Sequence, residues 1–228
     1  MPPELPPNTG SAWIAVHAAA NHKDWDTLIK LQKSGASIDT RDDEGNTALG
    51  TACRQGDAEA VRKLIQMGAS VEAANDAGET PLMAAGAAEQ SEIVQVLLKA
   101  GANVKTRTPA SGHTALHWTL ARPHGNDEKI AAIVRMLLQA GAEINQPSRS
   151  GMTPLMHAAW FGHAQAAAVL LEHGADPKLG DNQGRKALEL CKERGHLDIC
   201  RLIESGIEKS RQQKKESLGQ KFARWWKG

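Results

Sequence analysis

Aliphatic residues gather in short runs along most of this chain, and each run stops at a glycine. Residues 28–31 form the first run, and five such runs end in a Gly-Ala pair before a sixth fades at Gly206. Apolar pairs within the runs, such as Leu97 with Leu98, predict one helix per run, and the glycine predicts a left-handed turn that ends it. These glycines are Gly35, Gly68, Gly101, Gly141 and Gly174.

A second motif, Gly-x-Thr-(Ala/Pro)-Leu, recurs in phase with the first at steps of 33, 34, 39 and 33 residues. The threonine is a good helix N-cap because its hydroxyl accepts a hydrogen bond from an unpaired backbone N–H. A proline at the first helical position costs nothing, since that N–H has no partner in the helix anyway. We expect the motif leucines to point into a helical hairpin, and they are Leu49, Leu82, Leu116, Leu155 and, in a decayed copy, Leu188.

On these two motifs the sequence resembles the ankyrin-repeat family, which has a 33-residue period with Thr-Pro-Leu-His and a later Leu-Leu and Gly-Ala. The resemblance covers roughly residues 11–207 and implies an all-α solenoid of stacked helix-turn-helix units joined by β-hairpin loops. Degenerate first and last copies are expected because each has one face toward water. The predicted repeats are 11–43, 44–76, 77–110, 111–149, 150–182 and 183–207, after a Pro-rich segment over 1–10.

Repeat four is longer than the others, with 29 residues from Gly112 to Gly141 where the two preceding repeats have 23. Pro, Gly and Asn among residues 121–128 predict that the extra residues form a loop between the two helices. Such a loop is either a tolerated surface insertion or a carrier of function.

A basic tail over residues 208–228 follows the repeats and carries an aromatic stripe at helical spacing. Three interpretations stay open: the stripe covers the last repeat, it docks on a membrane surface or a partner, or the tail is disordered. A single amphipathic segment without a lipid anchor binds a membrane weakly, so membrane contact is the less favoured expectation. The docking candidates are Phe222, Trp225, Trp226, Lys221 and Arg224.

Composition narrows the function classes. Twenty-seven basic and 26 acidic residues give a formal charge of +1, which argues against a nucleic-acid-coating domain. The three cysteines, Cys53, Cys191 and Cys200, are odd in number and widely spaced, so we expect no disulfide framework and a reducing compartment. No signal-peptide or membrane-spanning pattern is visible, and a cytoplasmic location is expected.

Catalytic and metal-binding motifs are missing from the sequence. It has no Cys-x-x-Cys pair, no His-Glu-x-x-His, no Gly-x-Ser-x-Gly elbow and no phosphate-binding loop. The resemblance implies that His117, His163 and His196 are structural. We therefore expect that the protein is not an enzyme and that it binds no cofactor and no metal ion.

The resemblance implies binding on a concave face built from the first helices and the hairpin loops that precede them. Trp160 and Phe161 are adjacent aromatics at variable surface positions of that face, and large exposed aromatics are costly unless a partner covers them. The alternative is that Trp160 packs on its neighbouring repeats. The predicted partner-binding residues are Trp160 and Phe161, flanked by Arg122, Arg149 and Met152, with Arg54, Gln55, Glu79 and His113.

These residues predict a monomeric protein-protein interaction module that acts as an adaptor, an inhibitor or a regulatory subunit. The partner is expected to be another protein. The alternative function is a membrane-proximal adaptor that docks through the basic C-terminal tail.

Overall fold

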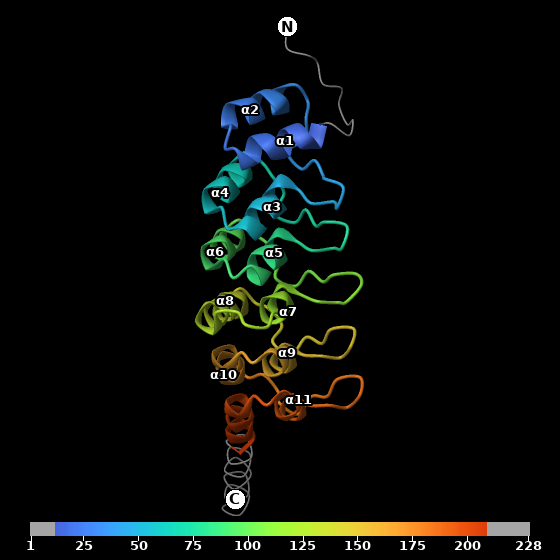
Figure 1. The fold of residues 1–228 in the computed structure, drawn as a ribbon, viewed down its shortest axis with the longest axis vertical. Coiled ribbons are helices and arrows are strands. Elements are labelled where there is room, and N and C mark those ends of the chain that lie inside the picture. Colours follow the sequence, from blue (N-terminus) through green and yellow to red (C-terminus); the bar gives the residue numbers. More distant parts are fainter. Residues whose placement is uncertain (1–11, 209–228) are drawn as a thin grey trace, which may run out of the picture.

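Pairs of antiparallel helices stack in a single row in this computed structural model, which describes residues 12–208 (Figure 1). The N-terminal segment 1–10 and the candidate tail residues between 209 and 228 lie outside the described part. The pairs are α1 (Ala12–Asn21) with α2 (Trp25–Lys33), α3 (Ala48–Gln55) with α4 (Ala58–Gln66), α5 (Pro81–Ala87) with α6 (Ser91–Lys99), α7 (Ala115–Leu120) with α8 (Asp127–Gln139), α9 (Pro154–Phe161) with α10 (Ala164–Glu172), and α11 (Ala187–Arg194) with a helix over 197–208.

In three of the repeats, a threonine caps the start of the first helix, as the sequence predicts. The hydroxyl oxygens of Thr47, Thr80 and Thr153 accept hydrogen bonds from backbone N–H groups 3.2–3.4 Å away. Thr114 differs because its hydroxyl lies 2.9 Å from Nδ1 of His117, the histidine of its own repeat. These caps fix where each helix starts, and so they fix the direction in which its leucine points.

Left-handed glycines end the second helices. Gly35, Gly68, Gly101, Gly141 and Gly174 have φ between 88° and 96°, a region that is strained for residues with a Cβ atom. The prediction of a glycine turn after each aliphatic run is confirmed at all five positions.

The core is one continuous strip of leucine, isoleucine, valine and alanine that runs through all the helix pairs. Leu49, Leu82, Leu116 and Leu155 are at most 1% exposed. Leu188 is only half-buried, and it lies in the last helix pair of the described residues, where no further described pair packs against it. Each pair buries its apolar face against the pairs on either side, so neighbour contacts hold the stack together.

The loops between repeats are tight hairpin turns that no regular strand extends in residues 12–208. An isolated bridge joins Gly180 to Lys186. Each turn is closed by a backbone hydrogen bond, such as that from the N–H of Asn75 to the carbonyl of Glu79 at 3.0 Å. The all-α fold class is therefore correct, and the β character of the loops is limited to these closures.

The insertion in repeat four makes a short loop and also lengthens a helix. The predicted loop covers only 121–126, because Asp127 and Glu128 already belong to α8, which has 13 residues where α4, α6 and α10 have nine. The Asp127 carboxylate accepts hydrogen bonds from the backbone N–H groups of Gln165 (2.7 Å) and Ala166 (3.3 Å) at the start of α10. The insertion thus caps a helix of the following repeat.

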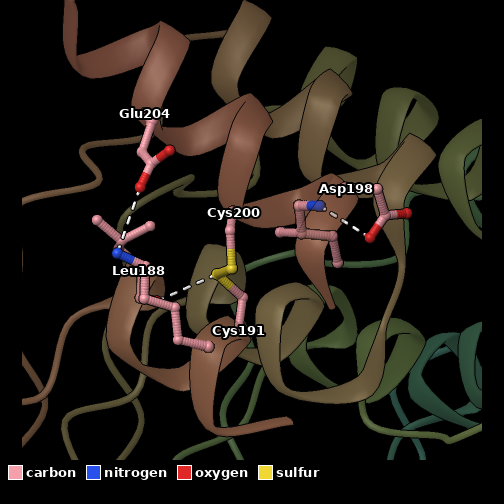
Figure 2. Close-up of a disulfide and its surroundings, with 7 residues drawn as sticks. Leu188, Cys191, Asp198, Cys200 and Glu204 are labelled. Atoms are coloured by element: carbon pink, nitrogen blue, oxygen red, sulfur yellow. Dashed lines mark hydrogen bonds and ion pairs between the residues drawn. A yellow bond between two sulfur atoms is a disulfide. The ribbon is translucent and has the colours of Figure 1, made fainter. Parts of the chain in front are cut away.

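A disulfide between Cys191 and Cys200 corrects one sequence expectation. Figure 2 shows the two sulfur atoms joined between α11 and the helix over 197–208. The antiparallel packing of these helices brings the two Cα atoms to 5.8 Å, although the residues are nine positions apart. Cys53 is the free, buried cysteine. The cysteine spacing therefore gives no support for a reducing compartment.

None of the helices within 12–208 is long and apolar enough to cross a membrane.

Truncation of a core leucine tests the packing. Leu97 in α6 is fully buried, whereas the adjacent Leu98 is half-buried. We expect Leu97→Ala to lower the free energy of unfolding by about 2–5 kcal/mol, because it leaves a cavity, and Leu98→Ala to lower it by less. Urea unfolding monitored by circular dichroism measures both, and equal losses would contradict this packing.

Reduction tests the disulfide. A cross-link that closes a loop of about ten residues stabilises a fold by about 3 kcal/mol through the unfolded chain. We expect a reductant to destabilise the wild-type protein by about that amount and to leave the stability of a Cys200→Ser variant unchanged. Titration of three free thiols in the unreduced, unfolded wild-type protein would contradict the assignment.

Candidate functional site

The odd-numbered helices and the hairpin loops before them form one side of the stack, with the loops projecting beyond them and the even-numbered helices behind (Figure 1). We call this side the helix–hairpin face. Eight of the nine residues predicted to bind a partner belong to the odd-numbered helices or the hairpin loops, and the ninth, Arg122, is the second residue after the end of α7.

A hollow of about 210 Å³ lies on this face between the second, third and fourth pairs. It exists because Ala87, Ala88 and Ala121 are small, whereas the equivalent positions hold Arg54 and Gln55 in the repeat before. In the fifth repeat, the equivalent positions hold Trp160 and Phe161. The hollow is lined by Arg54, Glu79, Ala84, Ala87, Ala88, Trp118, Ala121 and Arg122.

The two arginines at the hollow differ in their partners. Arg54 forms an ion pair with Glu79 at 2.8 Å, and Glu79 also accepts a hydrogen bond from Asn75 at 3.1 Å. The Arg122 guanidinium donates to the carbonyl of Ala87 at 3.1 Å and has no carboxylate partner within residues 12–208. One side of the hollow is therefore neutralised, and the other keeps a positive charge.

Three histidines from two repeats pack together beside the hollow, and we call them the imidazole cluster: His113, His117 and His157. Their ring centroids lie 5.1–5.3 Å apart, with the first two stacked and the third edge-on to both. Trp118 lies 6.2 Å from His113, and Phe161 lies 6.2 Å from His157. The cluster therefore links the hollow to the aromatic residues of the fifth pair.

His117 is held by hydrogen bonds at both ring nitrogens. Its Nδ1 accepts from the backbone N–H of Thr114 at 3.2 Å, which leaves Nε2 to donate to the carbonyl of Met152 in the next repeat at 3.3 Å. Burial, with a smaller contribution from the charge of His113, lowers the pKa of His117 to about 4. The expected structural role of His117 is confirmed by these bonds.

His157 has both ring nitrogens buried without a hydrogen-bond partner among the described residues. Burial is the main cause that lowers its pKa to about 3, and His117 and His113 add to the effect. Burial also lowers the pKa of His113. No group of three or more His, Cys, Asp or Glu side chains within 12–208 is arranged to hold a metal ion.

Trp160 and Phe161 are half-buried, which is intermediate between the two alternatives posed by the sequence. Trp160 packs against the core, and the Arg194 guanidinium lies 4.6 Å from the centre of its ring. Such a cation–π contact orients the arginine and leaves its remaining N–H groups available. Part of each aromatic surface stays open on the helix–hairpin face.

The other predicted residues fall into separate groups. The hollow brings together Arg54, Glu79 and Arg122, whereas Gln55 is exposed and does not line it. Met152 is half-buried. Arg149 has an exposed side chain, and its backbone joins two hairpins: its N–H donates to Ser111 at 2.8 Å. The predicted patch is therefore a row along the face rather than one centre.

Sequence reasoning gave no chemical role to His157 and missed the contact between Arg194 and Trp160. Equivalent positions in adjacent repeats are neighbours in a stack, so aligning the repeats could have predicted both contacts. Trp118 and His157 are equivalent, as are Trp160 and Arg194 within one position.

The match to known families agrees with the architecture. Residues 16–108, 90–181 and 116–213 match the family described as ankyrin repeats (3 copies). The fold defines a helical repeat protein, and the chain belongs to the ankyrin-repeat family.

Several curated proteins are similar to parts of the chain. "Probable E3 ubiquitin-protein ligase XBOS34" of Oryza sativa subsp. japonica is 38% identical over 77 residues, which is 33% of this chain and 15% of the relative. Potassium channel AKT1 of Oryza sativa subsp. indica is 34% identical over 96 residues, or 42% and 10%. E3 ubiquitin-protein ligase Ufd4 of Drosophila melanogaster is 35% identical over 97 residues, or 41% and 3%. The chain thus spans less than a sixth of each of these three relatives.

The imidazole cluster predicts acid sensitivity. Since the folded-state pKa values of His117 and His157 lie below the ordinary value of 6.5, their neutral packing stabilises the fold above that pH. The stabilisation is lost as the pH falls from 6.5 toward about 4 for His117 and about 3 for His157, because the unfolded chain binds the protons first. We expect a loss of about 2 kcal/mol at pH 5 for each buried imidazole.

Urea unfolding at pH 7 and pH 5 checks this expectation. The His157→Gln variant should lose less stability between the two pH values than the wild-type protein. His22→Gln, which changes an exposed histidine outside the cluster, is the matched control and should follow the wild type. Parallel losses in all three proteins would show that the cluster is not responsible.

Proposed function

We propose that this chain binds a partner protein through the helix–hairpin face, as an adaptor, an inhibitor or a regulatory subunit. Ankyrin repeats are in general protein-protein interaction modules. The observation that carries the proposal is the row formed by the hollow, the imidazole cluster and the half-buried Trp160 and Phe161. Tryptophan and arginine are the commonest anchors of protein interfaces, and both occur in this row.

The similar proteins support a binding role rather than a shared activity. Two of them are named as ubiquitin ligases and one as a potassium channel, and this chain matches only a small share of each. Proteins with such different printed activities share the repeats, which is expected if the repeats serve for recognition.

We propose that this face is non-catalytic, and two of its features support the proposal. A volume of about 210 Å³ is below the roughly 300–1,000 Å³ that is typical of small-molecule sites. The buried His117 uses both ring nitrogens for contacts within the stack, so it has no free nitrogen for proton transfer.

The remaining sequence predictions stay predictions. Membrane docking depends on Phe222, Trp225 and Trp226, which lie outside the described residues, and no contact bears on the monomeric state. The Cys191–Cys200 disulfide argues against the expected cytoplasmic location, because cytosolic thiols are normally kept reduced.

Truncation of Trp160 tests the proposed face. We expect Trp160→Ala to weaken partner binding by about 2–4 kcal/mol, or roughly 30- to 1,000-fold, because it removes a large anchor. Proteins captured by the wild type are identified by mass spectrometry, and their affinities are then measured by calorimetry. Ile29→Ala, which changes an exposed apolar residue of α2 away from this face, is the control.

Urea unfolding of both variants separates loss of binding from loss of fold. The proposed face would be wrong if the partner bound Trp160→Ala as tightly as the wild type. It would also be wrong if Ile29→Ala weakened binding as much as Trp160→Ala.

A further inference from the structure

Four arginines near or on the helix–hairpin face lack a carboxylate partner among the described residues. Arg107, Arg122, Arg149 and Arg194 are all exposed, and none of them forms an ion pair within 12–208. These four extend along the later repeats. We call them the arginine row.

Arg107 and Arg149 lie in adjacent hairpins, before α7 and before α9. Arg122 lies just past the opposite end of α7. The Arg107 side chain donates to the carbonyls of Gly112 (3.1 Å) and Pro147 (2.9 Å), while Arg149 follows Pro147 in the next hairpin. Arg122 follows the C-terminal end of α7, beside the hollow. The six residues of α7 alone span about 9 Å, so a peptide that reaches from Arg122 to the hairpin arginines needs at least about three extended residues.

The earlier repeats carry the opposite charge. The hairpins before α3 and α5 hold Asp42, Asp43, Glu44, Asp76 and Glu79. Of these, Asp76 and Glu79 are neutralised by Arg41 and Arg54. An acidic chain would be repelled from these hairpins and attracted to the arginine row.

The hollow adds an apolar anchor point at the start of the row. Its floor is four alanines and the Trp118 ring, and its volume of about 210 Å³ suits one large side chain rather than a drug-sized molecule. The guanidinium of Arg122 lines the hollow, so an apolar side chain seated there would place its neighbouring residues next to a positive charge.

We propose that the partner segment recognised by this face is an acidic peptide with one bulky apolar side chain. The apolar side chain occupies the hollow, and carboxylates on its C- or N-terminal side pair with Arg122 and then with Arg107 and Arg149. The inference rests on the proposed function and specifies the chemistry of its partner.

The probe is a fluorescein-labelled peptide, Glu-Asp-Glu-Leu-Glu-Asp-Glu-Asp, added to the full chain and followed by fluorescence anisotropy. Two altered peptides isolate the two features: one has Gln and Asn in place of every acid, and the other has Gly in place of Leu. A labelled single-stranded oligonucleotide of similar charge is the fourth ligand. We expect the first peptide to bind at least tenfold more tightly than each of the other three ligands.

Variants locate the binding on the face. Arg122→Gln should weaken the acidic peptide by about tenfold and reduce the dependence of its affinity on salt, because rim charges govern that dependence. Ala121→Met, which fills the hollow, should weaken the Leu-containing peptide and leave the Gly-containing peptide unchanged. Arg135→Gln, which changes an exposed arginine of α8 without an ion pair in the described chain, is the matched control and should behave as the wild type.

Equal affinity for the acidic and amide peptides, an unchanged affinity of Arg122→Gln, or tighter binding of the oligonucleotide would overturn the inference. So would the absence of measurable peptide binding by a wild-type protein with an intact unfolding curve. If a captured partner still depends on Trp160 in that case, only the partner chemistry is wrong. If Trp160→Ala also has no effect, the helix–hairpin face itself is wrong.

Discussion

The structure depends on the apolar contact between each helix pair and the next. A single pair of helices with at most 13 residues each has too little core to fold alone, and its buried leucines would face water on both sides. Stacking covers those sides and joins the buried residues into one strip. The cross-repeat bonds of His117 to Met152 and of His163 to Arg122 (2.8 Å) fix the register between neighbours. Everything on the helix–hairpin face is positioned by this register.

The face gains its features because the stack is regular and its exposed positions are not. The first helix of each repeat ends at an equivalent place, where the third repeat has Ala87 and Ala88 beside the hollow and the fifth has the half-buried Trp160 and Phe161. The imidazole cluster fills the space between the hollow and these two aromatic residues. Its burial lowers the pKa of His157 to about 3 and so keeps it neutral, which leaves the positive charge of the face to the arginines. The shape and the charge of the face therefore vary from repeat to repeat, while the arrangement of the helix pairs stays the same.

The repeat fold could be predicted from the sequence because its determinants are local. A threonine cap such as Thr80 and a glycine stop such as Gly101 act within one turn of the helix, and their period shows directly. The disulfide could not be predicted, since Cys191 and Cys200 become neighbours only when the last two helices pack. The insertion was predicted as a loop, but the helix cap supplied by Asp127 crosses to the next repeat. The hollow depends on small residues, which leave no positive signal in a sequence.

Native-state hydrogen exchange measured along the whole chain tests the stacking account most directly. If neighbour contacts hold the fold, amide protection in the presence of a reductant should be highest in α5 to α8 and fall toward both ends, because each terminal pair of the described residues packs against one helix pair instead of two. A terminal pair that is protected as strongly as the centre, or protection that breaks into independent blocks, would contradict the account.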